Sequence, residues 1–92
     1  MLRRAIRFTD DQGRSFEYVL SGGMRGGVAT VRVESVGEHP EVFPALNFPT
    51  NMATHAVLLA IEQMKAWPQH KGMRCELDYR PLSRPDMGVM PD

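Results

Sequence analysis

The chain has 92 residues, of which 42% are hydrophobic and 24% are charged, and its formal net charge is zero. This length fits one globular domain without a second hydrophobic core, and a single cysteine excludes an intramolecular disulfide framework. No apolar run approaches the ~20 residues that a membrane span needs, so we expect a cytoplasmic protein that does not interact with a membrane.

The charges are distributed unevenly along the chain. Residues 1–32 contain six arginines and carry a net charge of +3, whereas residues 33–64 contain no lysine or arginine and carry −4. Two interpretations remain open. The charges form a mixed, solvated surface, or the molecule is bipolar and meets a basic groove with one side and a phosphate backbone with the other.

The first two predicted elements form a β-hairpin. Residues 4–9 and 14–20 alternate between apolar and polar side chains, the pattern of strands with one buried face. The residues on the apolar faces are Ile6, Phe8, Phe16, Tyr18 and Leu20. Residues 10–13 supply turn chemistry, since aspartate favours turns and Gly13 can adopt a positive φ.

A glycine-rich segment, residues 21–27, follows the predicted hairpin. It lacks the lysine of a P-loop, and it precedes a strand rather than the helix of a dinucleotide-binding motif. We expect a flexible connection, too long for a tight turn. The alternative is a mobile finger that orders on binding, with Arg25 pairing with a phosphate or a carboxylate.

A third strand is predicted over residues 28–36, where β-branched residues are frequent. One face carries Ala29, Val31 and Val33, and the other carries Thr30, Arg32 and Glu34. Residues 37–49 contain three prolines, so we expect an irregular connection. Its apolar residues are expected to pack against the core: Val42, Phe43, Leu46 and Phe48.

Residues 51–67 are predicted to form the one helix of the chain. Thr50 or Asn51 can cap its start, and Pro68 ends it because proline cannot continue the hydrogen-bond ladder. An apolar stripe at helical spacing comprises Ala53, Val57, Ala60, Ile61, Met64 and Trp67. Three apolar residues fall outside this stripe, and they are either covered by loops or form a contact patch: Met52, Leu58 and Leu59.

The last predicted strand covers residues 73–80. Its apolar face holds Met73, Cys75, Leu77 and Tyr79, and its polar face holds Arg74, Glu76, Asp78 and Arg80. The order of elements predicts an α+β fold, a small antiparallel sheet (β-β-β-α-β) with one helix packed on one face. Residues 1–80 would form this domain, and the proline-containing residues 81–92 a flexible tail.

Catalytic and metal-binding patterns are absent from the sequence. Cys75 lies within the apolar face of a strand, where burial raises a thiol pKa. Neither an HxxxH motif nor a cysteine pair is present, and we place His39 and His70 in loops and His55 on the solvated side of the helix. We therefore expect no enzyme activity, no metal, no cofactor and no small-molecule substrate.

Residues 53–60, alanine-rich and preceded by three strands, resemble the second helix of the double-stranded RNA-binding domain. That resemblance implies phosphate contacts from a lysine cluster at the helix start. The corresponding residues 49–53 read Pro-Thr-Asn-Met-Ala, and residues 1–9 form a predicted strand where the family has its first helix. The family's main source of phosphate contacts therefore has no counterpart here.

The hairpin of residues 6–20, the helix of residues 51–67 and the strand of residues 73–80 together resemble the architecture of small phage-encoded anti-CRISPR proteins. This resemblance implies an inhibitor that docks on a CRISPR–Cas surveillance complex, made of protein and guide RNA, in the host-cell cytoplasm. Such an inhibitor blocks recognition of target DNA. These inhibitors share no common motif, so the resemblance assigns no residue.

The sequence therefore favours a non-enzymatic binding protein. The candidate contact residues are Arg25, Arg32, Arg74, Glu76, Arg80, Met52 and Leu59. One alternative is direct nucleic-acid binding through an arginine-bearing sheet face and the glycine-rich segment. Another is a small structural or assembly protein that buries the apolar helix residues in an oligomer interface.

Overall fold

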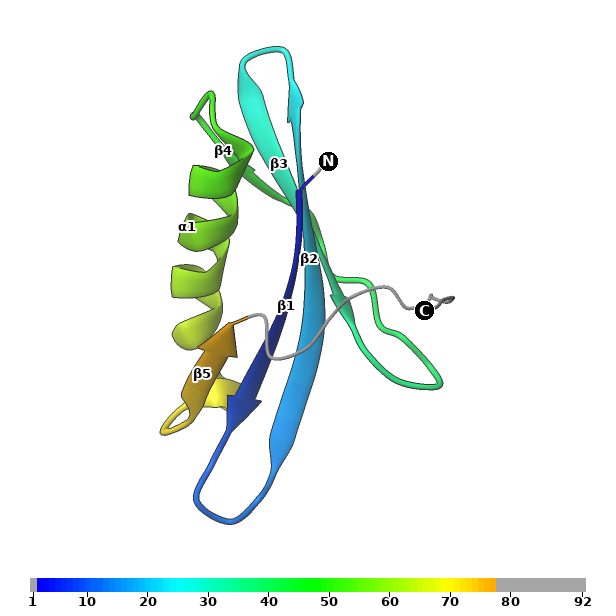
Figure 1. Cartoon of the computed structure of the whole chain (residues 1–92), viewed down its shortest axis with the longest axis vertical. Coiled ribbons are helices and arrows are strands. Elements are labelled where there is room, and N and C mark those ends of the chain that lie inside the picture. The colour runs from blue at the N-terminus through cyan, green and yellow to red at the C-terminus, as the bar shows by residue number, and fades with distance from the viewer. Residues whose placement is uncertain (1, 78–92) are drawn as a thin grey trace, which may run out of the picture.

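The computed structural model describes residues 2–77. Five strands form one sheet in the order β4-β3-β2-β1-β5, and every neighbouring pair is antiparallel (Figure 1). In chain order the elements are β1 (Leu2–Thr9), β2 (Ser15–Arg25), β3 (Val28–Ser35), β4 (Leu46–Phe48), α1 (Ala53–Lys65), the 3₁₀ turn η1 (Pro68–His70) and β5 (Arg74–Leu77). The predicted α+β fold, an antiparallel sheet with one helix, is confirmed.

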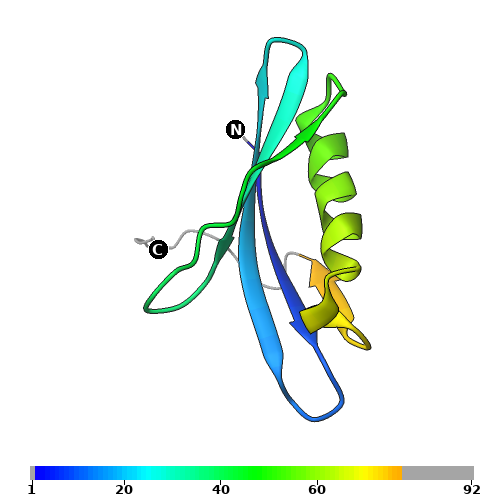
Figure 2. The same cartoon turned by 180° about the vertical axis from the view of Figure 1, so that it is seen from behind.

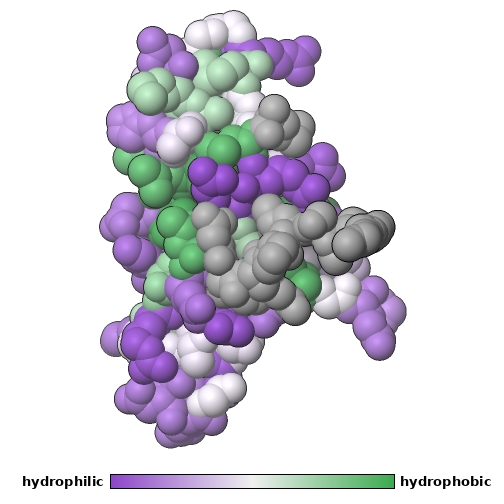
Figure 3. Space-filling model, in the orientation of Figure 1, coloured by the Kyte–Doolittle hydropathy of each residue, from purple (hydrophilic) through white to green (hydrophobic). Residues whose placement is uncertain are grey.

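The helix α1 lies along one face of the sheet, as the front and back views both show (Figures 1 and 2). Strand alternation directs the apolar side chains of β1, β2 and β3 toward α1. The core between these two layers consists of Ile6, Phe8, Tyr18, Leu20, Ala29, Val31, Val33, Phe48, Ala56, Val57, Ala60, Ile61 and Met64. Hydrophilic residues gather instead at the end of the molecule that holds the β1–β2 turn (Figure 3).

The β1–β2 hairpin has the predicted strands and the predicted turn. The Asp10 carboxylate accepts hydrogen bonds from the backbone N–H groups of Gln12 and Arg14, both at 2.9 Å. The backbone N–H of Asp10 donates to the Arg14 carbonyl at 3.0 Å, and Gly13 has a φ of 85°. Aspartate and glycine therefore make this turn through the two mechanisms expected of them.

The glycine-rich segment differs from its prediction. Residues 21–25 continue β2 and pair with β3, with Arg25 opposite Val28. Gly26 and Gly27 alone form the connection, and both have positive φ values, 58° and 80°, as a type I′ hairpin turn requires. The expected flexible connection was wrong because Gly22 and Gly23 lie within a strand, and glycine content alone does not distinguish a strand from a loop.

The segment before the helix is more regular than predicted. It contains β4, and Val42 forms an isolated bridge with Glu34. Phe43, Leu46 and Phe48 contact the core as expected, but Val42 is 51% exposed, so its predicted burial was wrong. The bridge holds the Val42 backbone beside β3, while half of its side chain remains exposed.

The helix is shorter than predicted at its start. Met52 is the N-cap residue without a side-chain cap, and the Thr50 hydroxyl accepts a hydrogen bond at 3.3 Å from the Met52 backbone N–H. At the other end Trp67 is extended, with ψ at 139°, and Pro68 begins η1. The extended Trp67 is the expected effect of Pro68, but α1 itself ends at Lys65, two residues earlier than predicted.

Strand β5 forms one edge of the sheet and pairs only with β1 in the described part of the chain. Cys75 is half-buried, and Leu77 is 45% exposed, so this strand lacks the fully buried face that its alternation predicts. An edge strand that the helix covers only in part leaves these side chains near solvent. The remaining predicted strand residues, 78–80, and the predicted tail, 81–92, lie outside the described residues.

Candidate functional site

The sheet face opposite α1 carries most of the charged strand residues. No helix or strand within residues 2–77 packs over this face. A row across three strands, Ala5–Val19–Glu34, divides it, and Ala5 is buried there. On one side of this row lies a group around Arg7, and on the other lies a group around Arg32, so the two ends of the face have different chemistry.

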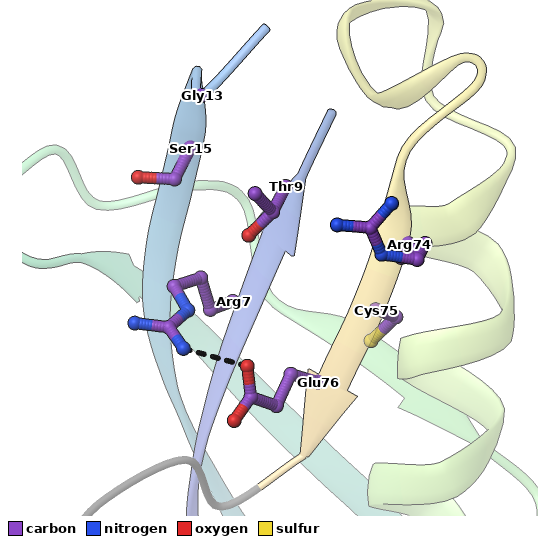
Figure 4. A pocket seen from close by; sticks show the side chains of 7 residues that line it. All are labelled: Arg7, Thr9, Gly13, Ser15, Arg74, Cys75 and Glu76. Atoms are coloured by element: carbon purple, nitrogen blue, oxygen red, sulfur yellow. Dashed lines mark hydrogen bonds and ion pairs between the residues drawn. The ribbon is translucent and has the colours of Figure 1, made fainter. Parts of the chain in front are cut away.

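The charges near β5 neutralise one another. Arg7 donates to the Glu76 carboxylate at 2.6 Å, and Arg74 donates to the Asp11 carboxylate at 3.0 Å. Arg7, Arg74 and Glu76 border a hollow of about 500 Å³ between the ends of β1, β2 and β5 (Figure 4). Two predicted contact residues, Arg74 and Glu76, thus link the edge strand to the β1–β2 turn and to β1, and each already has an internal partner.

Three arginines lie at the other end of the face. Arg3 and Arg32 lie on either side of Ser21 in one cross-strand row, and Arg25 lies further along β2. Within the described part of the chain, none of these three arginines has a hydrogen bond or ion pair through its guanidinium group. A hollow of about 490 Å³ is lined by Arg3, Ser21, Gly23, Met24, Arg25, Thr30, Arg32 and Glu34. We call this set of residues the arginine hollow.

The arginine hollow contains two of the predicted contact residues, Arg25 and Arg32, and one that sequence reasoning missed. The predicted strand of residues 1–9 includes Arg3, but the alternation of apolar and polar side chains was analysed only from Arg4 onward. In the structure β1 starts at Leu2. Strict alternation continued by one residue before Arg4 places Arg3 on the polar face, opposite Ile6 and Phe8.

The other predicted contact residues do not join this site. Met52 is 59% exposed at the start of α1, which lies on the far side of the sheet. Leu59 packs in part against the core, and Leu58 beside it is 49% exposed. Arg80 lies outside the described residues. The structure therefore places the apolar candidates and the arginine candidates on different layers.

His70 was predicted to be a loop residue, and that prediction was wrong. It is 2% exposed, and its ring stacks on Phe8 with centroids 3.9 Å apart. Its Nδ1 lies 2.7 Å from the Met64 carbonyl oxygen, and its Nε2 lies 2.7 Å from the Tyr18 hydroxyl. Burial lowers the pKa of His70, so the ring is held neutral. No sequence pattern marked this residue, because the turn that buries it depends on contacts with β1 and β2.

Other reactive groups are few in the described chain. Burial raises the pKa of the Cys75 thiol, as predicted, so the thiolate is disfavoured. Across residues 2–77 no three His, Cys, Asp or Glu side chains converge in a way that would hold a metal ion. The same residues include no helix long and apolar enough to cross a membrane.

Comparisons with protein-family models, with curated proteins and with solved structures found no match to this chain. The function is therefore argued from the chemistry of the arginine hollow and of the face that carries it.

Proposed function

We propose that this protein is a non-enzymatic binding protein that docks through the sheet face opposite α1. In its sharpest form it is an inhibitor of the anti-CRISPR type, which binds a surveillance complex of protein and guide RNA in the host-cell cytoplasm. One observation carries the proposal. The arginines of the hollow have no partner within the described chain, on a face over which no described helix or strand packs.

The charge distribution supports a docking role over a purely structural one. Unpaired arginines on one face repel one another, so they do not help the isolated fold. Arginine is, by contrast, the residue best suited to bind phosphate or carboxylate groups on a partner, because its guanidinium fork makes two parallel hydrogen bonds. The arginine hollow therefore suits an anionic surface such as exposed guide RNA.

The two described groups with the greatest potential for catalysis are held in unreactive forms. His70 is enclosed by Tyr18, Phe8 and the end of α1, and the lining of the arginine hollow does not include it. The raised pKa of the Cys75 thiol opposes its use as a nucleophile. Both observations support binding over catalysis.

Target-DNA binding by reconstituted surveillance complexes tests the proposal. We expect the purified protein to lower the affinity of at least one complex for its target duplex. We expect Arg3→Ala and Arg32→Ala to weaken that inhibition. Lys71→Ala is the control and should leave it unchanged, because this substitution also removes one positive charge but at an exposed residue outside the hollow. Unchanged target binding by every complex of a type I and type II panel, at saturating protein, would contradict the inhibitor proposal.

A further inference from the structure

Gly23 has no structural reason to be glycine within the described chain. It lies inside β2 opposite Thr30, it has no positive φ, and a Cβ atom built on it would meet nothing within 4 Å. The other glycines of this segment have clear reasons. A Cβ on Gly22 would lie 2.9 Å from Val57 Cγ2, and Gly26 and Gly27 form the positive-φ turn. Glycine weakens a strand interior, and one reason to keep it there is close approach by a ligand or another backbone.

The bare backbone of Gly23 lies between the three unpaired arginines. Gly23 is two residues from Ser21, which Arg3 and Arg32 flank, and two residues from Arg25 in the other direction. Neighbouring strands lie about 4.8 Å apart, so the Cα atoms of Arg3 and Arg32 are separated by about 10 Å. Arginine side chains are long enough to converge over such a gap. One acidic residue, Glu34, lines the hollow, which leaves a net charge of +2 around Gly23.

We infer that the arginine hollow binds the phosphodiester backbone of a nucleic-acid strand, and that Gly23 is where the strand comes closest to the sheet. This inference rests on the proposed use of the same face. A phosphodiester chain offers repeated negative charges that several arginines contact together, and the Ser21 hydroxyl adds a neutral donor. An unsubstituted backbone at Gly23 lets a bulky phosphate or sugar settle between the arginines.

The positions of the aromatic residues indicate how the strand is bound. By strand register, the described aromatic residues of the sheet lie on the α1 face: Phe8, Phe16, Tyr18 and Phe48. No described aromatic residue lines the arginine hollow. Single-strand binders that hold bases do so by stacking them on aromatic rings. Without such rings, this site would contact phosphates alone, so binding would be independent of base sequence and strongly dependent on salt.

The test is a fluorescence-anisotropy titration with 20-nucleotide RNA and DNA strands of two unrelated sequences, between 25 and 200 mM salt. Three phosphate contacts predict a slope of log K against log salt of about −2 for single strands. Arg3→Ala, Arg25→Ala and Arg32→Ala should each make that slope shallower by about 0.7, and Lys71→Ala should not change it. No binding at 25 mM salt, or arginine variants that keep the full slope, would overturn the inference.

Gly23→Val is the sharpest variant, because it separates folding from binding. Valine is a better strand residue than glycine and has open space at this position, so the thermal midpoint should stay the same or rise. Nucleic-acid affinity should fall at least about fivefold, since the side chain occupies the closest approach of the strand. Gly22→Ala is the matched control. It should lower the thermal midpoint, because its Cβ clashes with Val57.

Two further outcomes are informative. Displacement of the oligonucleotide by polyglutamate at equal charge concentration would show that the site takes carboxylates, and would overturn the assignment to phosphodiesters. A protein that inhibits a surveillance complex but binds no oligonucleotide would refute this inference and leave the proposed function standing. A protein that binds oligonucleotides as described but inhibits no complex would support this inference and refute the proposed inhibitor function.

Discussion

The Tyr18 hydroxyl and His70 Nε2 lie 2.7 Å apart in the core, within hydrogen-bond distance. The Met64 carbonyl, 2.7 Å from His70 Nδ1, can only accept a hydrogen bond, so Nδ1 must donate. In the neutral ring Nε2 then accepts from the Tyr18 O–H. Burial raises the pKa of Tyr18, which keeps the hydroxyl protonated for this role. Protonation of His70 would require the Tyr18 hydroxyl to turn and accept from Nε2 instead of donating to it.

The stability of the protein should therefore decrease in mild acid. The pKa of His70 is lowered in the folded protein from its ordinary value of 6.5, mainly by burial. The unfolded chain thus binds this proton at a higher pH than the folded chain does. We expect full stability above pH 6.5 and a progressive loss as pH falls from there toward the folded pKa. Urea unfolding followed by Trp67 fluorescence between pH 5 and 8 measures this loss.

Exposed His39 provides the control for this pH dependence. His39→Gln should leave the acid-dependent loss in place, whereas His70→Gln should remove it from a protein that is less stable overall. Equal pH dependence of the unfolding free energy in the parent and in His70→Gln would show that another group is responsible.

Tyr18→Phe tests the hydrogen bond itself. The ring keeps its edge contacts with Phe8 and Trp67, but His70 Nε2 loses its donor in a buried site. A buried acceptor without a partner costs about 1–3 kcal/mol, so the free energy of unfolding should fall by about that amount. The His70 pKa should rise at the same time, since the O–H donor no longer stabilises the neutral ring, and NMR titration of the imidazole would detect it. A loss below about 0.5 kcal/mol with an unchanged His70 pKa would contradict the assigned tautomer.

The two sides of α1 should respond differently to alanine. Val57 is 1% exposed, so Val57→Ala leaves a cavity in the core and should cost about 2 kcal/mol of unfolding free energy. Leu58, next in sequence, is 49% exposed, and Leu58→Ala should change stability by no more than about 0.5 kcal/mol. Chemical denaturation of both variants measures the difference.

Sedimentation of the same variants tests the assembly alternative. Self-association through the exposed helix residues Met52 and Leu58 would make Leu58→Ala shift the monomer–oligomer equilibrium toward monomer. A parent protein that is monomeric from micromolar to millimolar concentration would contradict the homo-oligomeric form of that alternative.

Cys75 should react slowly in the folded protein. Burial raises the pKa of its thiol and outweighs nearby Lys65, which lowers it, so little thiolate is present at pH 8. We expect alkylation by iodoacetamide to be several-fold slower in buffer than in 6 M guanidinium chloride. Lys65→Gln should slow the folded reaction further, because it removes the positive charge that favours the thiolate. Equal rates in the two solvents would show that the thiol is not protected.

Local patterns in the sequence predicted most of the fold. Alternation in β1, β2 and β3 assigned their buried faces correctly, and Pro68 marked the end of α1 to within two residues. These predictions succeeded because each depends only on neighbouring residues: the alternation of apolar and polar side chains in a strand, or the restriction that proline places on the backbone. The start of α1 was predicted less well, since the Thr50 hydroxyl can serve a turn as readily as a helix cap.

Predictions that depended on contacts between distant segments failed. The glycine content of residues 21–25 predicts a loop, but these residues continue β2, and the close approach of Val57 requires a glycine at position 22. The sequence likewise predicts a loop at His70, although β1, β2 and the end of α1 enclose this residue. The arginine hollow was only half predicted for the same reason. Arg25 and Arg32 were expected contact residues. Alternation places Arg3 on the same face, but its position in one row with Arg32 depends on the pairing of β1, β2 and β3.

By itself the sequence determined the class of fold, the buried faces of three strands and the presence of unusual glycines and arginines in its first third. Only the tertiary structure decided which of those charges are neutralised, and which are not, within residues 2–77. The physical reason is that pairing depends on register. Antiparallel β5 brings Glu76 to Arg7, whereas Ser21, a neutral residue, separates Arg3 from Arg32. A register of this kind depends on the packing of the whole sheet against α1.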